Sequence, residues 1–325
     1  MYQTHLKLVA GAKIPLPARG GMPESCHIID EDSVLAVNAA LATGRPLLVR
    51  GEPGTGKSQL ARAAAEALGR ALVTNAVDSR TETRDLLWSV DAVARLAEAQ
   101  MMGALREVNE RALRDRLAIQ AFVHPGPLWW AFDWESAHKQ AESLQLSVPT
   151  TPDGWKPAHG VVVLIDEIDK ADPSVPNGLL DAFGHGRFEV PGRPPVVMNP
   201  ECRPLVLITT NEERALPDAF LRRCLVLPLS LPKDRAGLVA ALIERGRAHF
   251  PEAKCSDEVL RQAADLLASD REKFYSTDLC PPGLAEYIDL LRAVCEQEQN
   301  QEKQRKLMVR IAKFALKKHP DSSER

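Results

Sequence analysis

The sequence lacks the marks of several protein classes. No apolar run approaches the length of a membrane span, and the N-terminal apolar run is too short for a signal peptide, so we expect a cytoplasmic protein with no membrane partner. The six cysteines form no C-x-x-C pair and have no histidine at zinc-ligand spacing, which predicts buried thiols in a reducing compartment. The formal net charge of −3 gives no global basic field for nucleic acid, although it leaves a local basic patch open.

The most informative stretch combines glycines with a lysine. An apolar run, Leu47 to Val49, is followed by the pattern Gly51-x-x-x-x-Gly56-Lys57-Ser58. Glycines let the backbone curl so that successive N–H groups point inward, and a helix that begins near Lys57 adds the positive end of its dipole. The pattern predicts a strand, a phosphate-binding loop and a helix that together bind a nucleotide. We expect the nucleotide to contact Gly51, Glu52, Pro53, Gly54, Thr55, Gly56, Lys57, Ser58 and Gln59.

Two positions of this loop have specific chemistry. Lys57 can reach the β and γ phosphates as a point charge, and the hydroxyl of Ser58 is suited to Mg²⁺. No Asn-Lys-x-Asp guanine signature occurs in the chain, which favours ATP over GTP. We therefore expect ATP and Mg²⁺ as the cofactors.

Two later strands end in polar residues that suit phosphoryl transfer. Val161 to Ile165 is an apolar run of mostly β-branched residues, typical of a strand buried on both faces, and Asp166 and Glu167 follow it. Asp166 would hold Mg²⁺, and Glu167 would polarise the attacking water. The next buried strand, Leu205 to Ile208, precedes Asn211, which would orient that water or contact the γ phosphate; an Asx turn is the alternative.

The remaining pattern predicts an α/β fold followed by helices. Residues 1–27 indicate an extended or loop-like arm, and residues 71–77 form a second strand that gives a βαβ opening with parallel pairing. Strands stop near residue 232, and helices are expected at 233–250, 256–276, 281–298 and 302–318. We therefore expect a parallel sheet between helices over residues 1–230 and a small all-α lid domain over residues 231–325.

A long segment separates the two motifs, and we place an insertion at about residues 88–135. It contains an expected helix from about Asp91 to Gln120, whose narrow apolar stripe would pack along one side while the helix projects from the body. The stripe consists of Met101, Leu105, Val108 and Ala112. Next comes a tryptophan cluster, which would stack on bases or grip a peptide, or else belong to the core or to a subunit contact. Its members are Trp129, Trp130 and Trp134.

In their order and spacing, these motifs resemble those of the AAA+ ATPases, and among them the MoxR-like group. The resemblance covers about residues 28–291. The interval between the glycine-rich motif and the acidic motif is longer than a minimal AAA+ core needs, and the projecting segment falls where MoxR-like proteins insert an element into helix 2. The matching motifs are Walker A at Gly51–Ser58, Walker B at Val161–Glu167, sensor 1 at Thr209–Asn211 and the arginine-finger region at Leu216–Arg223.

The resemblance implies a hexameric ring in which an arginine from one subunit completes the ATP site of the next. Arg223 is the first candidate for this finger and Arg222 the second, although both could be surface cations. Asn75 would be the switch that holds Glu167 inactive. The sequence departs from the family at Gly283, where a sensor 2 arginine is expected.

Three functions fit these observations. The first is a chaperone-like remodelling ATPase of MoxR type, a ring that acts on a protein client or partner with the insertion as its working surface. The second is a nucleic-acid-associated motor or defence-system subunit, motivated by the tryptophan cluster and by the basic helix at 303–318, which is otherwise a solvated lid helix. The third is an ATP-gated scaffold with slow hydrolysis, motivated by Gly283.

Overall fold

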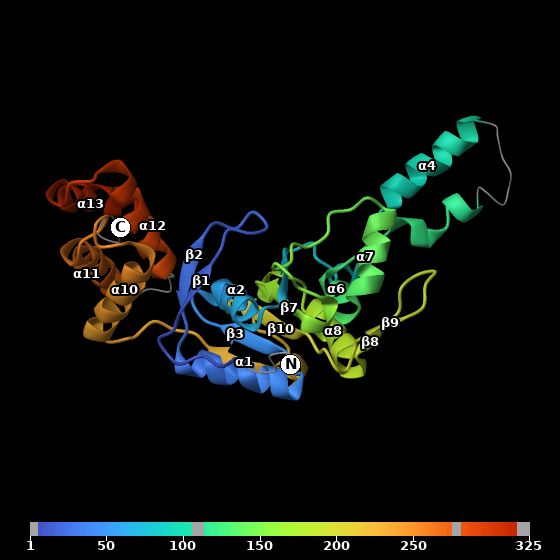
Figure 1. Cartoon of the computed structure of the whole chain (residues 1–325), viewed down its shortest axis with the longest axis horizontal. Coiled ribbons are helices and arrows are strands. Elements are labelled where there is room, and N and C mark those ends of the chain that lie inside the picture. Colours follow the sequence, from blue (N-terminus) through green and yellow to red (C-terminus); the bar gives the residue numbers. More distant parts are fainter. Residues whose placement is uncertain (1–5, 106–113, 275–280, 317–325) are drawn as a thin grey trace. The chain divides into compact units, whose positions relative to one another are not determined.

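A five-stranded parallel sheet is the framework of the chain (Figure 1). Its strands are, in spatial order, β11 (Leu225–Pro228), β3 (Leu47–Arg50), β10 (Leu205–Thr210), β7 (Val161–Asp166) and β4 (Ala71–Ala76). β7 pairs in parallel with both β10 and β4. The predicted α/β class with a parallel sheet and a C-terminal helical region is thus confirmed.

The predicted direct pairing within the βαβ opening is wrong, because β10 and β7 lie between β3 and β4. The burial of each strand gives the physical reason. β10 is buried throughout and β7 at all but its last residue, whereas β4 exposes part of its length. The most apolar strands occupy the centre of the sheet, where both faces are covered, and β4 occupies an edge.

The structure, a computed structural model, describes residues 6–105, 114–274 and 281–316. The chain divides into two compact units, the first comprising Met1–Lys7, Val34–Leu48 and Ala64–Leu227, and the second Leu8–Ser33, Val49–Ala63 and Pro228–Arg325. The helices α1 (Glu31–Thr43) and α2 (Lys57–Leu68) contribute residues to both units. Among the described helices, none is long and apolar enough to cross a membrane.

Unit 1 contains most of the sheet and the elements that cover it. Its other helices are α3 (Thr83–Leu87), α4 (Ala92–Leu105), α6 (Pro127–Phe132), α7 (Trp134–Ser143), α8 (Ser174–His185) and α9 (Asp218–Leu221). Single 3-10 turns occur at Ile119–Phe122, Pro157–His159 and Ile168–Lys170. Two short antiparallel pairs complete it, β5 (Trp88–Val90) with β6 (Val123–Pro125), and β8 (Arg187–Phe188) with β9 (Val196–Val197).

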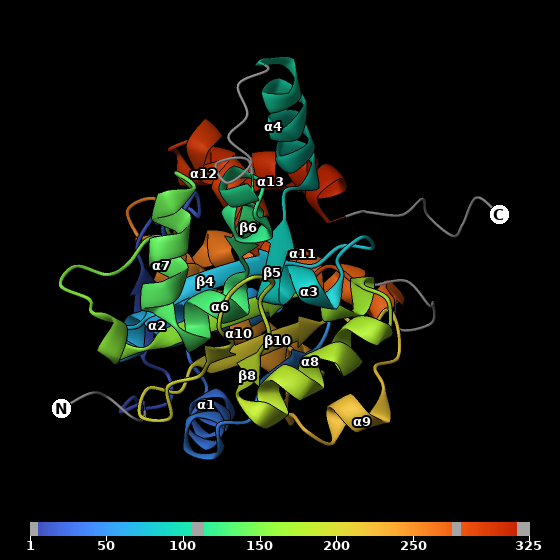
Figure 2. The ribbon, with the colours of Figure 1, turned by 90° about the vertical axis from the view of Figure 1, so that its right-hand side faces the viewer.

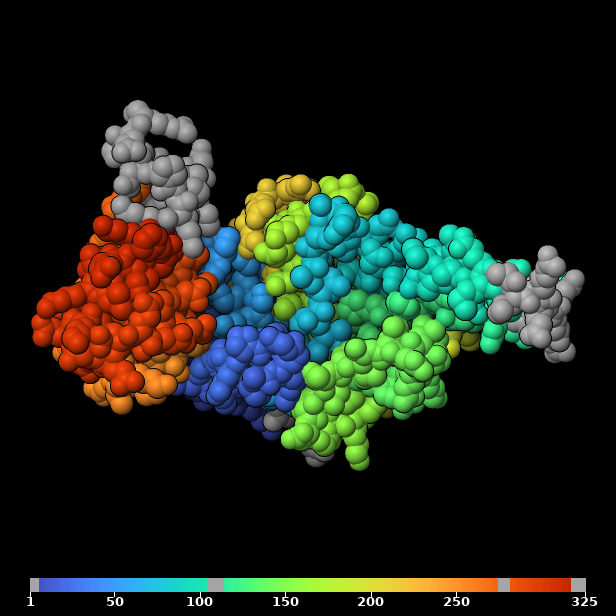
Figure 3. All heavy atoms as spheres, turned by 90° about the horizontal axis from the view of Figure 1, so that it is seen from above, coloured from blue at the N-terminus to red at the C-terminus, as the bar shows by residue number. Residues whose placement is uncertain are grey.

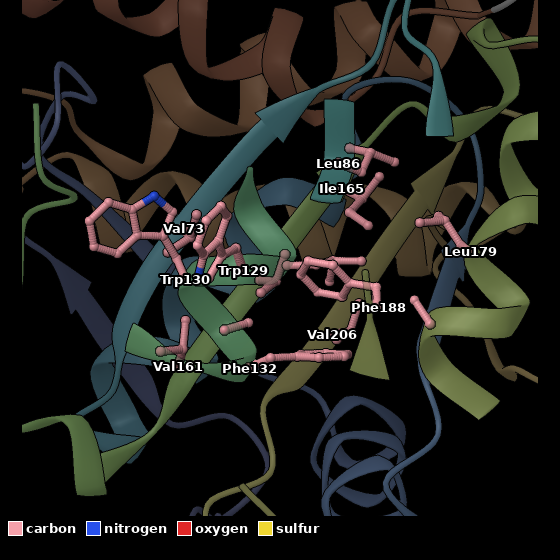
Figure 4. Close-up of a cluster of buried hydrophobic side chains, with 14 of the residues drawn as sticks. Val73, Leu86, Trp129, Trp130, Phe132, Val161, Ile165, Leu179, Phe188 and Val206 are labelled. Atoms are coloured by element: carbon pink, nitrogen blue, oxygen red, sulfur yellow. The ribbon is translucent and has the colours of Figure 1, made fainter. Parts of the chain in front are cut away.

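The tryptophan cluster belongs to the core of unit 1 (Figure 4). Trp129, Trp130 and Trp134 are only 1%, 5% and 8% exposed. The indole N–H of Trp129 donates to the hydroxyl of Ser136 at 2.7 Å, which satisfies its one polar group. Of the roles that the sequence left open for the cluster, core packing is therefore the one observed, and these rings offer no surface on which bases could stack.

The β5 and β6 pair closes the insertion at its base (Figure 2). In this pair Trp88 lies opposite Pro125. From this base α4 extends as a narrow projection, shown in teal in Figure 3. The predicted packing of its stripe is wrong for Met101, which is 60% exposed, whereas the adjacent Met102 is buried. Val108 and Ala112 lie outside the described residues, so the packing of the rest of the stripe stays a prediction.

The N-terminal arm of unit 2, for which the sequence indicated an extended or loop-like arm, is a hairpin of β1 (Lys13–Leu16) and β2 (Ser25–Ile28). The prolines of this arm weakened the strand signal in the sequence. A two-stranded sheet nevertheless tolerates proline, because one edge of each strand pairs with no neighbour and needs no N–H donor there. Ile14 and Leu16 are buried on one face of β1. The alternating burial of this short strand, together with contacts between β2 and the first lid helix, holds the hairpin in unit 2.

Four helices form the C-terminal part of unit 2. They are α10 (Arg235–His249), α11 (Asp257–Phe274), α12 (Leu284–Gln297) and α13 (Gln301–Ala315). They agree with the four predicted helices. The expected ends of α11 and α13, at residues 276 and 318, lie outside the described residues. Their common core includes Leu242, Leu260, Tyr287, Leu291 and Met308.

Candidate functional site

The glycine-rich loop follows β3 and leads into α2, as the sequence predicts. Gly51, Gly54 and Gly56 have φ values of 151°, 74° and 97°, a conformation that few other residues adopt. At Gly51 the constraint is also steric, because a Cβ there would lie 2.1 Å from the carbonyl oxygen of Leu229. The backbone therefore curls tightly at the end of the strand.

Lys57 is folded back over this curled loop. Its Nζ donates to the carbonyl oxygens of Gly51 and Glu52 at 2.8 and 2.9 Å, and the residue is only 6% exposed. The hydroxyl of Thr55 also donates to the Glu52 carbonyl, at 2.9 Å. Because α2 begins at Lys57, the positive end of its dipole lies at this loop. This donor set, an ammonium with helix N–H groups on a glycine cradle, fits a polyphosphate.

His27 lies beside the loop in β2, with its ring 4.0 Å from the place that a Cβ on Gly56 would take. Burial, followed by the charge of Arg245, lowers the pKa of His27 to about 4. The imidazole is therefore neutral near pH 7 and does not add to the positive charge that Lys57 supplies.

In unit 1, one hydroxyl contacts both acidic residues at the end of β7. The hydroxyl of Thr209, at 0% exposed, donates to Oδ1 of Asp166 at 2.5 Å and accepts the backbone N–H of Glu167 at 2.9 Å. Glu167 has φ 59° and ψ 50°, a left-handed conformation that is uncommon for a residue with a side chain. The Thr209 hydroxyl therefore stabilises the left-handed turn at Glu167 while it also binds the Asp166 carboxylate.

The side chain of Glu167 has a partner for each oxygen. Nδ2 of Asn211 donates to Oε1 at 3.2 Å, and Nζ of Lys170 forms an ion pair with Oε2. The hydrogen bond to Glu167 and then its charge raise the pKa of Lys170, so that the lysine stays protonated. The structure thus brings together the predicted Glu167 and Asn211 and adds Lys170 to them.

A second buried acid fixes the turn after β10. Asp169 is 2% exposed, and its Oδ2 accepts the backbone N–H groups of Asn211 and Glu213 at 3.2 and 3.0 Å. These bonds set the position from which the Asn211 amide reaches Glu167. Asn75, the predicted switch, lies in β4 opposite Ile165, and the buried oxygen of its side chain accepts no hydrogen bond from the described part of the chain.

Arg222 and Arg223 follow α9 and are exposed, and neither guanidinium pairs with a carboxylate among residues 6–105, 114–274 and 281–316. Their backbone is anchored by Arg45. The Arg45 guanidinium donates to the carbonyl oxygens of Arg223 and Cys224 at 3.1 and 3.0 Å, and to that of Arg222. Arg45 thus satisfies the carbonyls that the short helix leaves without partners.

Sequence reasoning placed Thr209 in the sensor 1 motif without giving its hydroxyl a role, and it missed Asp169, Lys170 and Arg45. Lys170 carried a local signal, because it follows Glu167 by three residues, a spacing at which side chains on a helical turn meet. Arg45 carried none, since it lies 177 residues from Arg222.

Comparison with known proteins supports the sequence resemblance. The family described as "AAA domain (dynein-related subfamily)" matches residues 46–245, which is more than half of the chain. Two similar solved structures are single-residue mutants of RuvB from Thermotoga maritima. One is 14% identical, with 85% of this chain and 66% of that chain covered and a TM-score of 0.46. The other is 15% identical, with 87% and 75% covered and a TM-score of 0.40. No curated protein matches the chain.

We predict that Thr209→Val, which keeps the shape but removes the hydroxyl, lowers the free energy of unfolding by roughly 1–3 kcal/mol, because the Glu167 N–H and the Asp166 carboxylate lose a buried partner. Urea denaturation of the purified chain measures this. The control is Thr74→Val on β4, an exposed position where we expect a change within about 0.5 kcal/mol. Equal stabilities of the two variants would contradict the role of the hydroxyl.

Proposed function

We propose that this chain, which belongs to the AAA domain family of the dynein-related subfamily, is an ATP-hydrolysing remodelling ATPase of MoxR type. It acts as an oligomeric, hexameric ring on a protein client or partner. The observation that carries the proposal is the carboxylate of Glu167, held at the end of β7 by Asn211 and Lys170 in a chain that also has a complete phosphate-binding loop.

ATP is the nucleotide that we assign to the loop from Gly51 to Gln59. The curled backbone and the first turn of α2 would bind the phosphate oxygens, and Lys57 would exchange its two carbonyl partners for them. Ser58 and Asp166 are the residues that we propose as ligands of Mg²⁺, which when bound neutralises charge on the phosphates.

Glu167 is the residue that we propose to activate water. One carboxylate oxygen would accept a hydrogen bond from the attacking water and take its proton as the bond to the γ phosphorus forms and the bond between that phosphorus and the bridging oxygen breaks, which releases ADP. Asn211 already contacts Oε1, so its amide can hold the carboxylate in one orientation during this step. Lys170 occupies Oε2, and the water must either use the other oxygen or displace the lysine.

The arginine pair supports a site that is completed by a neighbouring subunit. A finger must be available to another chain, and Arg222 and Arg223 are both exposed on a backbone that Arg45 anchors. We propose Arg223 as the finger, with Arg222 as the second candidate, to stabilise charge that develops on the γ phosphate.

A protein client is favoured over nucleic acid. The tryptophans that motivated the hypothesis of a nucleic-acid motor are buried. That hypothesis therefore loses its main support. The projecting α4 instead exposes three large apolar side chains, which we propose to contact the client. These are Val93 at 79%, Leu96 at 60% and Met101 at 60% exposed. We propose this helix as part of the working surface.

One observation favours a second candidate, the ATP-gated scaffold with slow hydrolysis. The proposed base is engaged by Lys170, so turnover would wait until the ion pair opens. ATP-dependent assembly without measurable single-turnover hydrolysis would distinguish the scaffold from the remodelling ATPase.

We predict Mg²⁺-dependent ATPase activity that falls by about 10²-fold or more in Glu167→Gln, because the amide cannot accept the proton of the attacking water. ATP binding, measured by titration calorimetry, should survive in this variant. Glu201→Gln, at an exposed position outside the site, is the control and should keep normal activity. Normal turnover by Glu167→Gln would remove Glu167 from the mechanism.

Mixing two inactive variants tests the shared site. Arg223→Ala and Glu167→Gln should each lose activity, whereas a mixture should regain part of it, because some interfaces then combine an intact Glu167 with an intact Arg223 from the neighbour. Arg187→Ala, an exposed arginine in β8, serves as the control for loss of positive charge. A mixture no more active than its components would show that Arg223 does not act between subunits.

A further inference from the structure

Arg271 in α11 is a buried cation whose acidic partner lies in the phosphate-binding loop. Its side chain is 6% exposed, and Nη2 donates to Oε2 of Glu52 at 2.7 Å. Nη1 donates to the carbonyl oxygen of Pro282 at 2.8 Å, and Nε is buried without a hydrogen-bond partner among the described residues. Burying a charged guanidinium costs free energy, and an ion pair with further hydrogen bonds offsets part of this cost. All of these residues belong to unit 2.

The start of α12 approaches the same loop so closely that position 283 has no room for a side chain. The backbone N–H of Ala285 donates to the carbonyl oxygen of Gly54 at 3.2 Å. A Cβ on Gly283 would lie 2.9 Å from the carbonyl oxygen of Pro53, and backbone atoms cannot move aside cheaply. The arginine that the family resemblance leads one to expect at Gly283 is therefore excluded sterically. The lid cation that reaches the loop comes from α11 instead.

Glu52 poses an electrostatic problem for a loop that binds phosphates. Its side chain is 43% exposed and stands in the turn that wraps the proposed ligand. A carboxylate close to a polyphosphate repels it, and solvent screens this repulsion only in part. The guanidinium of Arg271 pairs with this carboxylate and offsets its negative charge.

We propose that Arg271 is a positioning residue for ATP, which it favours by neutralising Glu52 and by holding the segment from Glu52 to Gly54 against the lid. The inference rests on the proposed function, because the ligand is the nucleotide assigned to this loop. Arg271 acts through Glu52, and no contact between Arg271 and the phosphates is required.

Breaking the pair from its two ends separates this role from simple structural support. Arg271→Met leaves the Glu52 carboxylate uncompensated beside the phosphates, so ATP affinity should fall. Glu52→Gln removes the repelling charge and leaves the cation, so ATP affinity should rise. If the pair gave only structural support, both single variants would bind ATP more weakly, because either substitution breaks the same contact.

The experiment measures the Kd of a fluorescent ATP analogue with Mg²⁺ for the full chain and for Arg271→Met, Arg271→Lys, Glu52→Gln and the double variant Glu52→Gln/Arg271→Met. We expect Arg271→Met to weaken binding about tenfold, more at low salt than at high salt. Arg271→Lys keeps the charge and should retain most of the affinity, and the double variant should return close to the unmutated chain. The loss should be smaller for the ADP analogue, which carries less negative charge.

The proposal is overturned if Arg271→Met binds like the unmutated chain, or if Glu52→Gln weakens binding as much as Arg271→Met does. Thermal unfolding of each variant shows that it is folded. If Arg271→Met fails to fold, the direction of the change in ATP affinity of Glu52→Gln decides alone. The Glu52 side chain is partly exposed, so we expect this variant to fold. If the unmutated chain binds no nucleotide, the proposed function fails as well, whereas tight binding with unchanged variants overturns only this inference.

Discussion

The hydroxyl of Thr209 is the contact on which the acidic part of the site depends. Glu167 adopts a left-handed backbone conformation that costs free energy, and the hydroxyl stabilises it by accepting the Glu167 N–H while it donates to Asp166. The same hydroxyl thus contacts both acidic residues at the end of β7. In the function that we propose, Asp166 would bind a cation and Glu167 would activate water.

Three cations near the proposed sites have partners within their own unit. Lys57 is held by two loop carbonyls, Lys170 by Glu167, and Arg271 by Glu52. Such pairing keeps long side chains ordered near the places where they are needed, so less conformational entropy is lost when a ligand arrives. In the function that we propose, ATP binding would release Lys57 from its two carbonyl partners, whereas the pair of Arg271 with Glu52 would persist.

Local patterns in the sequence predicted the parts of the fold that local physics determines. The strand, loop and helix around Lys57 follow from glycine conformations and a helix start, and β7 follows from its β-branched apolar run. The position of β4 at a sheet edge and the pairing of Arg271 with Glu52, 219 residues apart, depend on packing between distant segments. No periodicity encodes such contacts. The β1 and β2 hairpin was missed for a related reason, because its prolines suppress a strand signal that tertiary contacts restore.

Binding of MgATP to the purified chain and to Lys57→Ala, compared by titration calorimetry, tests the central claim most directly. The account predicts one Mg²⁺-dependent site per chain, with affinity reduced by about tenfold or more in Lys57→Ala because the point charge on the phosphates is lost. Arg62→Ala, on the outer part of α2 where its guanidinium contacts Ser25 and Pro17, should bind normally. No binding by the unmutated chain, or equal binding by Lys57→Ala, would contradict the account.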